Sequence, residues 1–326
     1  MIVLSLFDGI SCGQIAFERL GITFDGQENK YIASEIKDFA IETTQLHYPN
    51  TIQVGDVCKL HYDKLTNALY SNCDWRDNKC YMENATKVLD GKPDIIIGGS
   101  PCQNFSLLRA TLGNAVDGLE GDKSKLFYEY LRLLHEIEPK YFLLENIRMK
   151  PEQKKELDDY LGVEGITINS KLVSFQSRTR NYWTNIPNVT EPEDLHIRFQ
   201  DYKDTDPIRC DEAMPKRTSS RIRMWSEGNG KGNLGTCANI TNADKVGCLT
   251  RKQDRCPNSG MIAYKDFARY LTRRELELAQ TLPVGYCDHL SYYRTCDVTG
   301  DGWTVDVIKH ILSFIPKEDL VYQYDK

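Results

Sequence analysis

The sequence predicts an α/β fold in which a mostly parallel sheet carries helices on both faces. Five short apolar runs in the first half of the chain have the length and composition of buried strands, and stretches of helical periodicity separate them. This alternation is typical of a parallel sheet, because the crossover between two parallel strands usually contains a helix. The five runs are IVLSLF (2–7), YIASEI (31–36), TIQVGDV (51–57), DIIIGG (94–99) and YFLLEN (141–146).

The clearest helical pattern lies before the fifth run, in SKLFYEYLRLLHEI (124–137). Phe127, Tyr130, Leu134 and Ile137 recur there at the spacing of one helix face. We therefore expect an amphipathic helix that packs on the sheet.

Later segments predict an antiparallel edge and two more helices. TINSKLV (167–173) and NYWTNI (181–186) are the candidate edge strands. Thr272 and Glu275 fit a capping box that opens a helix in TRRELELAQTL. A second helix is expected in TVDVIKHILSFI (304–315), whose apolar side chains lie on one side.

The composition changes after the second edge strand. From about 187 to 262 the chain is rich in Asn, Gly, Thr, Asp, Lys and Arg, and no periodicity is sustained. We expect a small irregular domain at 187–263 and a larger domain built from 1–186 and 264–326.

The overall composition is that of a soluble globular protein. Of 326 residues, 40% are hydrophobic and 27% are charged, which is enough apolar material for a real core. The net charge of −6 argues against a wholly basic nucleic-acid binder, so any such face must be a segregated patch. No apolar run is long enough to span a membrane, and the start MIVLSLFDGIS lacks the basic residues of a signal peptide. We expect a cytoplasmic protein without a membrane partner.

Eleven cysteines are spread along the chain without a C-x-x-C pair, which indicates reduced thiols. A zinc site built from Cys237, Cys248 and Cys256 is an alternative, but no His falls in that stretch and the spacing is wide. We expect no metal.

Acidic residues close the first three strands. Asp8 opens FDGISCG, whose Gly9 and Gly13 would let the backbone approach a ligand, and Glu35 and Asp56 lie at the ends of the next two strands. Ligands of open parallel sheets bind beyond the carboxyl ends of the strands, where acids can accept hydrogen bonds from a ribose and an adenine amino group. G-x-x-x-x-G-K-[ST] and G-x-G-x-x-G are absent, so a nucleoside cofactor fits better than a triphosphate or dinucleotide. The alternative is that each acid is merely a solvated strand end.

Reactive or charged residues follow the last two strands as well. The fourth runs into GGSPCQNFS, which places Cys102 in a tight turn where a thiol is accessible, although a lone Cys is more often a buried small hydrophobe. The fifth delivers Glu145 to the same edge, as a possible proton donor. In QSRTR, Gln176, Arg178 and Arg180 alternate, so in a strand they would share one face that suits a phosphate or a base carbonyl.

These motifs together resemble the cytosine-5 DNA methyltransferases. FDGISCG, the Glu35 strand, GDV, GGSPCQNFS, ENIR, QSRTR and RYLTRRELELAQTLP occur in the order and spacing of that family. The resemblance covers roughly residues 1–186 and 264–315. Pro-Cys-Gln after a glycine-rich strand end, followed by Glu-Asn and Q-x-R-x-R, is a strong joint signal, whereas the glycine loop alone would be weak.

The resemblance implies a Rossmann-like fold that binds S-adenosylmethionine and releases S-adenosylhomocysteine. The methyl group would go to carbon 5 of a cytosine flipped out of double-stranded DNA. In the family the Pro-Cys cysteine attacks carbon 6, the glutamate of Glu-Asn engages N3, and the arginines of Q-x-R-x-R hold the pyrimidine. The matching residues are Cys102, Glu145, Arg178 and Arg180.

The resemblance also assigns binding residues. Those expected at the cofactor are Phe7, Asp8, Gly9, Ile10, Gly13, Glu35, Ile36, Asp56, Val57, Ser100, Trp303 and Val305. Those expected near the substrate base are Pro101, Gln103, Ser106 and Gln176.

One element departs from most bacterial members of the family. DGWTVDVIKHI, like SLFDGI, YIASE and GGSPC, is similar to the eukaryotic de novo branch. Trp303 stands where most bacterial members have the Asn of a Gly-Asn pair, and it could pack against the methionine part of the cofactor.

Two basic stretches lie where the family keeps its target-recognition region. PKRTSSRIRMW (215–225) contains no acid, and CLTRKQDR (248–255) adds further cations. We expect them to contact DNA phosphates, although a basic stretch can also be a solvated loop. Their expected contact residues are Lys216, Arg217, Arg221, Arg223, Arg251 and Lys252.

Two other functions fit parts of this pattern. A tRNA cytosine methyltransferase shares the catalytic layout, but the sizeable basic insert favours duplex recognition. A non-catalytic DNA-binding relative would be expected to lack the cofactor loop or the Pro-Cys pair, and both are intact. We expect a monomeric bacterial or phage enzyme that modifies DNA, with a cognate restriction endonuclease as a partner if it serves restriction-modification.

Overall fold

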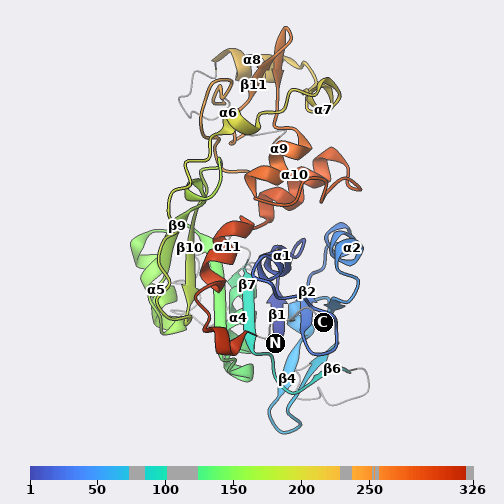
Figure 1. Ribbon diagram of the computed structural model, residues 1–326, viewed down its shortest axis with the longest axis vertical. Helices are drawn as coiled ribbons and strands as arrows, with labels where there is room; N and C mark the ends of the chain where they lie inside the picture. The colour runs from blue at the N-terminus through green and yellow to red at the C-terminus, as the bar shows by residue number, and fades with distance from the viewer. Residues whose placement is uncertain (73–84, 101–123, 228–236, 252, 254–256, 321–326) are drawn as a thin grey trace, which may run out of the picture. The chain divides into compact units, whose positions relative to one another are not determined.

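A computed structural model describes residues 1–72, 85–100, 124–227, 237–251, 253 and 257–320 (Figure 1). The chain divides into two compact units. The first is formed by 1–168, 180–190 and 311–326, and the second by 169–179 and 191–310.

The first unit is built on a seven-stranded sheet of order β3-β2-β1-β7-β8-β10-β9. The first five strands in this order are parallel to their neighbours, and β10 runs antiparallel to β8. The predicted parallel sheet with an antiparallel edge is therefore confirmed. The strands are β1 (Ile2–Leu6), β2 (Lys30–Ser34), β3 (Ile52–Gln53), β7 (Ile95–Gly99), β8 (Tyr141–Ile147), β9 (Ile166–Asn169) and β10 (Thr179–Thr184).

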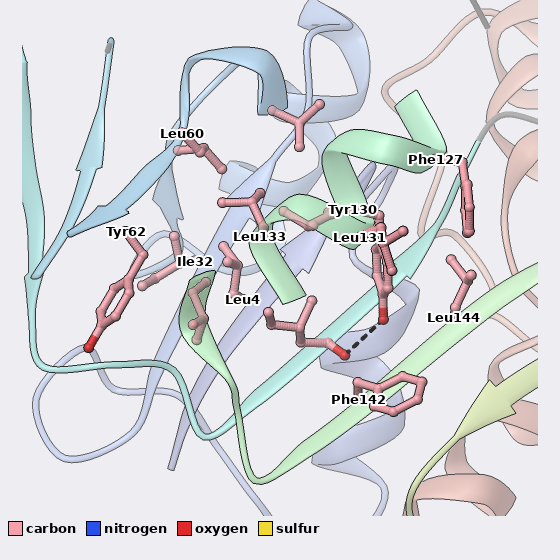
Figure 2. Packing of buried hydrophobic residues seen from close by; sticks show 14 of the residues in the cluster. Leu4, Ile32, Leu60, Tyr62, Phe127, Tyr130, Leu131, Leu133, Phe142 and Leu144 are labelled. Carbon is pink, nitrogen blue, oxygen red and sulfur yellow. Dashed lines mark hydrogen bonds between the residues drawn. The ribbon is translucent and has the colours of Figure 1, made fainter. Parts of the chain in front are cut away.

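One face of this sheet is covered by α4 (Ser124–Ile137) and α5 (Pro151–Leu161). Side chains that alternate along the strands point into this layer, because successive residues of a strand face opposite sides. They pack against the apolar stripe of α4, as Figure 2 shows. Labelled members of this cluster include Leu4, Ile32, Phe127, Tyr130, Phe142 and Leu144.

The opposite face carries α1 (Cys12–Glu18). The ring of Phe17 on this helix lies 5.6 Å from that of Phe24, which in turn lies 5.2 Å from the ring of Tyr31 on β2. Helices therefore cover both faces, as the sequence predicts. The helix that follows β2 is α2 (Asp38–His47).

A second, three-stranded antiparallel sheet lies between β3 and β7 in the sequence. Its strands are β4 (His61–Asp63), β5 (Ala68–Ser71) and β6 (Thr86–Asp90), in that order. The short 3-10 turn η1 (Val57–Lys59) leads into it. The sequence pattern does not predict this sheet.

The second unit has its own core and little regular sheet. Phe175, Phe199, Met261, Tyr270 and Leu276 are among its buried side chains. Its elements are η4 (Ser170–Leu172), α6 (Phe199–Tyr202), α7 (Pro207–Glu212), α8 (Ser219–Glu227), β11 (Ile262–Tyr264), β12 (Phe267–Arg269), α9 (Arg273–Ala279) and α10 (Tyr292–Asp301). Residues 264–310, which the sequence boundaries assign to the larger domain, contribute to this core.

The predicted capping box is present. Thr272 Oγ1 accepts a hydrogen bond from the backbone N–H of Glu275, whose side chain accepts one from Thr272 N at 2.7 Å. The last helix, α11 (Val305–Leu312), is followed by the 3-10 turn η5 (Lys317–Asp319). Within the described ranges, none of the helices has the length and apolarity needed to cross a membrane.

Candidate active site

The ends of the parallel strands bring the predicted site residues of the first unit to one edge of the sheet. Leu6 at the end of β1 pairs with Ser34 of β2 and with Gly98 of β7, and Gly99 pairs with Glu145 of β8. The segments that leave these strands therefore start side by side.

Asp8 lies just beyond β1, and its carboxylate faces the protein. Ser5 Oγ and Tyr31 Oη donate hydrogen bonds to Oδ1 at 2.6 and 2.9 Å, and Ser11 Oγ donates to Oδ2 at 2.5 Å. Thr44 on α2 donates to Ser11 Oγ at 3.1 Å, which extends the cluster. Burial raises the pKa of Asp8 above its usual value, although the hydroxyl donors, Ser11 first among them, act in the opposite direction.

The loop that carries Asp8 has three residues in the left-handed region. Phe7, Gly9 and Ser11 have φ of 59°, 63° and 56°. This conformation is natural for Gly but costs about 1–2 kcal/mol at each of the other two positions. The hydroxyl cluster around Asp8 holds them there. A Cβ added at Gly9 would meet no atom within 4 Å, so its backbone faces open space where a ligand can approach.

Glu35 connects the end of β2 to the same loop. Its Oε2 accepts a hydrogen bond from Gly9 N at 2.9 Å, and its Oε1 accepts from Ile36 N and Lys37 N at 2.7 and 2.9 Å. A carboxylate has about four lone-pair sites, so roughly one remains for a ligand hydroxyl. The Ile36 side chain is 70% exposed, which leaves an apolar surface beside this acid.

Asp56 lies beyond β3 and begins η1. Its Oδ1 accepts a hydrogen bond from Cys58 N at 2.9 Å, and Oδ2 has no partner among the described residues. Gly55, with φ of 71°, has no atom within 4 Å of an added Cβ, and its carbonyl accepts from Ser34 Oγ at 2.7 Å. Asp56 therefore offers an oxygen to a ligand from a fixed turn.

The last two strands carry the ionic part of the site. Arg180 Nε on β10 lies 2.9 Å from Glu145 Oε1 on β8, and both side chains are largely buried. The next residue, Asn146, donates through Nδ2 to Oγ of the buried Ser100 at 3.1 Å. This bond ties β8 to the segment that leaves β7 toward Cys102.

Four predicted residues, Pro101, Cys102, Gln103 and Ser106, lie outside the described residues, as does Lys252. The predicted cofactor residues Ile10, Gly13 and Val57 are buried, and Phe7 is partly buried against the core around α4. These four residues support the loops that follow the strands and leave little of their own surface for a ligand.

The residues of QSRTR do not share one strand face, because β10 begins only at Thr179. Gln176 is fully buried in the second unit, where its amide donates to Ala279 O at 2.9 Å and accepts from Leu249 N at 2.8 Å. Arg178 is also buried there. Its two terminal nitrogens contact Cys248 Sγ and the carbonyls of Leu249, Gly300 and Gly302 at 3.0 to 3.4 Å.

Trp303 and Val305 also lie in the second unit. Trp303 is half-buried and Val305 is fully buried, and Val305 N donates to Gln280 O at 3.0 Å. Thr304 stands between Trp303 and Val305 in the sequence, and its hydroxyl donates a hydrogen bond to Gln280 Oε1 at 2.8 Å.

The predicted phosphate-binding cations differ in their surroundings. Lys216 and Arg223 are exposed, and neither forms an ion pair with a described residue. Arg217 pairs with Asp266, and Arg251 Nε lies 3.0 Å from Asp297 and 3.4 Å from Asp301. The Arg221 side chain is half-buried on α8.

Sequence reasoning missed the supporting hydroxyls around Asp8. Ser5 and Tyr31 lie within apolar strands and have no motif of their own. Only their positions could have indicated this role. Ser5 precedes Asp8 by three residues, and Tyr31 pairs with Val3 on the neighbouring strand.

Comparisons with known proteins agree with this architecture. Residues 1–162 match the model of the C-5 cytosine-specific DNA methylase family. The type II methyltransferase M.FnuDI of Fusobacterium nucleatum is 28% identical over 148 residues, which make up 45% of this chain and 33% of that protein. The DNA (cytosine-5)-methyltransferase DRM2 of Arabidopsis thaliana is 35% identical over 138 residues, 40% of this chain and 18% of that protein.

The matched segments thus span a third or less of these relatives. The structure of the Entamoeba histolytica methyltransferase EhMeth has the same fold over 96% of this chain and 97% of its own, with a TM-score of 0.66 and 15% identity. Residues 1–162 thus form a C-5 cytosine-specific DNA methylase domain.

Proposed function

We propose that this chain transfers a methyl group from S-adenosylmethionine to carbon 5 of cytosine in double-stranded DNA. The observation that carries the proposal is the Glu145–Arg180 pair, 2.9 Å apart, at the strand end next to Gly99. From Gly99 the chain runs through Ser100 to Pro101 and Cys102. A carboxyl group, a guanidinium and a cysteine are together the groups needed to polarise and attack a pyrimidine.

The first three strand ends fit the cofactor. Asp56 Oδ2 is available for an adenine amino group, Glu35 keeps about one lone pair for a ribose hydroxyl, and Gly9 leaves open space for close approach. When bound, S-adenosylmethionine supplies an electrophilic methyl group on a positively charged sulfur and leaves as S-adenosylhomocysteine.

Cys102 acts on the pyrimidine ring. Carbon 5 of cytosine is a poor nucleophile, so the thiolate first forms a bond to carbon 6, and the displaced electron pair makes carbon 5 nucleophilic. After carbon 5 has taken the methyl group, its proton leaves to water. The electrons of that C–H bond restore the double bond between carbons 5 and 6 as the bond from carbon 6 to Cys102 breaks, and the thiolate is regenerated.

Glu145 and Arg180 stabilise the addition. The protonated carboxyl group of Glu145 donates a hydrogen bond to N3 of the ring, where negative charge develops, and Arg180 holds that carboxyl group in place. Arg178 has both terminal nitrogens occupied within the second unit, so we assign the base contact to Arg180 and a supporting role to Arg178.

The second unit is the DNA-recognition part of the proposal. A stacked base is out of reach of Cys102, so the cytosine must be flipped out at a cost of a few kcal/mol. Contacts from exposed cations to phosphates help to offset this cost. Lys216 and Arg223 are the best placed, since neither is neutralised by a described acid.

A covalent trap tests the proposal. Incubation with S-adenosylmethionine and a duplex containing 5-fluorocytosine should give an adduct that survives denaturing electrophoresis, because fluorine at carbon 5 blocks the elimination. Cys102→Ala should give no adduct. Cys210→Ala is the matched control and should react like the wild type, since burial raises the pKa of the Cys210 thiol and keeps it unreactive.

Failure of the wild type to form an adduct would refute catalysis, and an adduct with Cys102→Ala would refute the nucleophile. Methyl transfer to tRNA rather than duplex DNA in a parallel assay would replace the proposed substrate by the RNA alternative. Bisulfite sequencing of DNA from expressing cells should then reveal modified cytosines in a fixed sequence context.

A further inference from the structure

Helix α4 holds the turn that follows Asp56. Arg132, in the middle of this helix, donates through Nη2 to Leu60 O at 2.8 Å and to Val57 O at 3.5 Å. Glu136, one helical turn further on, accepts from Tyr62 N at 3.1 Å. The backbone from Val57 to Tyr62 is therefore bound at three points by two side chains of one helix.

Two acids fix the Arg132 guanidinium in this position. Nη2 and Nε lie 2.8 and 3.0 Å from Glu129 Oε2, and Nη1 lies 2.7 Å from Glu136 Oε1. Arg132 is only 15% exposed, so its charge is well shielded from water. Burial alone would raise the pKa of Glu136, but nearby His61 and Arg132 outweigh it and hold the pKa below its usual value.

Apolar packing supports the same arrangement. Leu60 and Tyr62 belong to the hydrophobic cluster that also contains Leu133 of α4 (Figure 2). The turn is thus anchored by apolar side chains and by backbone hydrogen bonds to Arg132 and Glu136. Asp56 stands at its start, joined to it by the bond from Cys58 N to Oδ1.

We propose that Arg132 is a positioning residue for adenine recognition, an inference that rests on the proposed function. By holding the carbonyls of Val57 and Leu60, Arg132 fixes the turn whose first residue, Asp56, presents its free oxygen to the base. That oxygen can accept a hydrogen bond from an amino group but repels a carbonyl oxygen at the same position. Arg132 therefore supports the preference for adenine over hypoxanthine without touching either base.

Calorimetric binding of S-adenosylhomocysteine and S-inosylhomocysteine tests this inference, because the two differ only in the amino group or oxygen at position 6 and in the hydrogen that hypoxanthine carries on N1. The wild type should prefer the adenosyl compound by about tenfold or more, equivalent to one good hydrogen bond. Arg132→Met should bind the adenosyl compound about tenfold more weakly and the inosyl compound nearly as before. Arg132→Lys, which keeps the charge but has one donor group, should lie between them.

Lys154→Met on α5 is the matched control. It also removes a partly buried cation paired one turn away, with Asp158 at 2.9 Å, but it lies away from the adenine turn. Its preference should equal that of the wild type. If Arg132→Met does not fold, Glu136→Gln tests the same contacts to the turn with a smaller change. It should also weaken the preference for the adenosyl compound.

Retention of the wild-type preference in Arg132→Met, or in Glu136→Gln where only that variant folds, would overturn the inference. Equal weakening of both compounds would also overturn it, because a general loss of stability does not distinguish the bases. A wild type that binds neither compound would instead refute the proposed function, so the two failures are distinguishable.

Discussion

Replacing Tyr31 by Phe removes one hydrogen bond that supports the loop carrying Asp8. Tyr31 lies within β2, is fully buried, and donates to Asp8 Oδ1 at 2.9 Å. It makes no expected contact with the cofactor. Any effect on cofactor affinity must therefore pass through Asp8 and the conformation of the loop.

The size of this effect follows from the contacts. A hydrogen bond to a charged group contributes about 1.5–3 kcal/mol. Ser5 and Ser11 still donate to Asp8 in the variant, so the lower end of this range applies. The left-handed conformations of Phe7 and Ser11 each cost about 1–2 kcal/mol, and a weakened cluster would allow them to relax. About 1.5 kcal/mol corresponds to an affinity for S-adenosylhomocysteine roughly tenfold weaker.

Calorimetric titration of Tyr31→Phe with S-adenosylhomocysteine measures this loss, and Tyr130→Phe is the control. Tyr130 is equally buried but lies on the other face of the sheet, where its hydroxyl makes only a long bond of 3.5 Å to Ile96 O (dashed in Figure 2). Its affinity should match the wild type. Equal affinities for the two variants would refute the idea that the Asp8 cluster shapes the loop.

Two further predictions concern the second unit. Burial acts to raise the pKa of Asp204, but hydrogen bonds, first from Arg209, hold it at about 2, below the usual 3.8. The ionised form of Asp204 stabilises the fold fully above pH 3.8, and this stabilisation is lost as the pH falls toward 2. In urea unfolding, the loss of unfolding free energy caused by Asp204→Asn should therefore be about 1 kcal/mol smaller at pH 3 than at pH 6. The same loss at both pH values would contradict this. Arg223→Ala should lower the slope of log K against log salt for duplex DNA by about 1. Arg251→Ala should change it less, since Asp297 and Asp301 already neutralise that guanidinium, and equal changes would refute this ranking.

Elements with strong local signals were predictable from the sequence. The bounds of α4 agree with the predicted 124–137, because its apolar residues keep a helical period over four turns. The capping box of α9 was also predictable, since Thr272 and Glu275 bond to each other's backbone within one turn, although Asp204 and Arg269 also bond to these side chains. In both cases the sequence signal itself lies within one segment.

The small sheet of β4, β5 and β6 could not be predicted in this way. Its strands have three to five residues, and β6 is mostly exposed. Such strands lack the apolar alternation that marks a half-buried strand. β3 was overestimated for a related reason, since only Ile52 and Gln53 of the run 51–57 form a strand before the chain turns at Gly55.

The directions in which the side chains of Gln176, Arg178 and Arg180 point depend on residues far away in the sequence. Alternation implies one shared face only inside a strand, and Arg178 precedes the start of β10. Its guanidinium is drawn to carbonyls more than 70 residues further along the chain, whereas Arg180 meets Glu145 on the neighbouring strand. No local pattern records these long-range partners.

The three acids at the strand ends look equivalent in the sequence, but their hydrogen bonds give them different capacities for a ligand. Asp8 accepts three hydrogen bonds and keeps about one lone pair, but its donors are the hydroxyl groups that hold the loop. Glu35 accepts from three backbone N–H groups and keeps about one lone pair, which allows it to orient the loop and hold a hydroxyl at once. Asp56 uses one oxygen for its own turn and leaves the other available. Asp56 accepts one hydrogen bond, whereas Glu35 and Asp8 accept three each, so the energetic cost of adding a ligand donor is lowest at Asp56. Adenine selectivity should therefore depend on Asp56 and the turn that carries it.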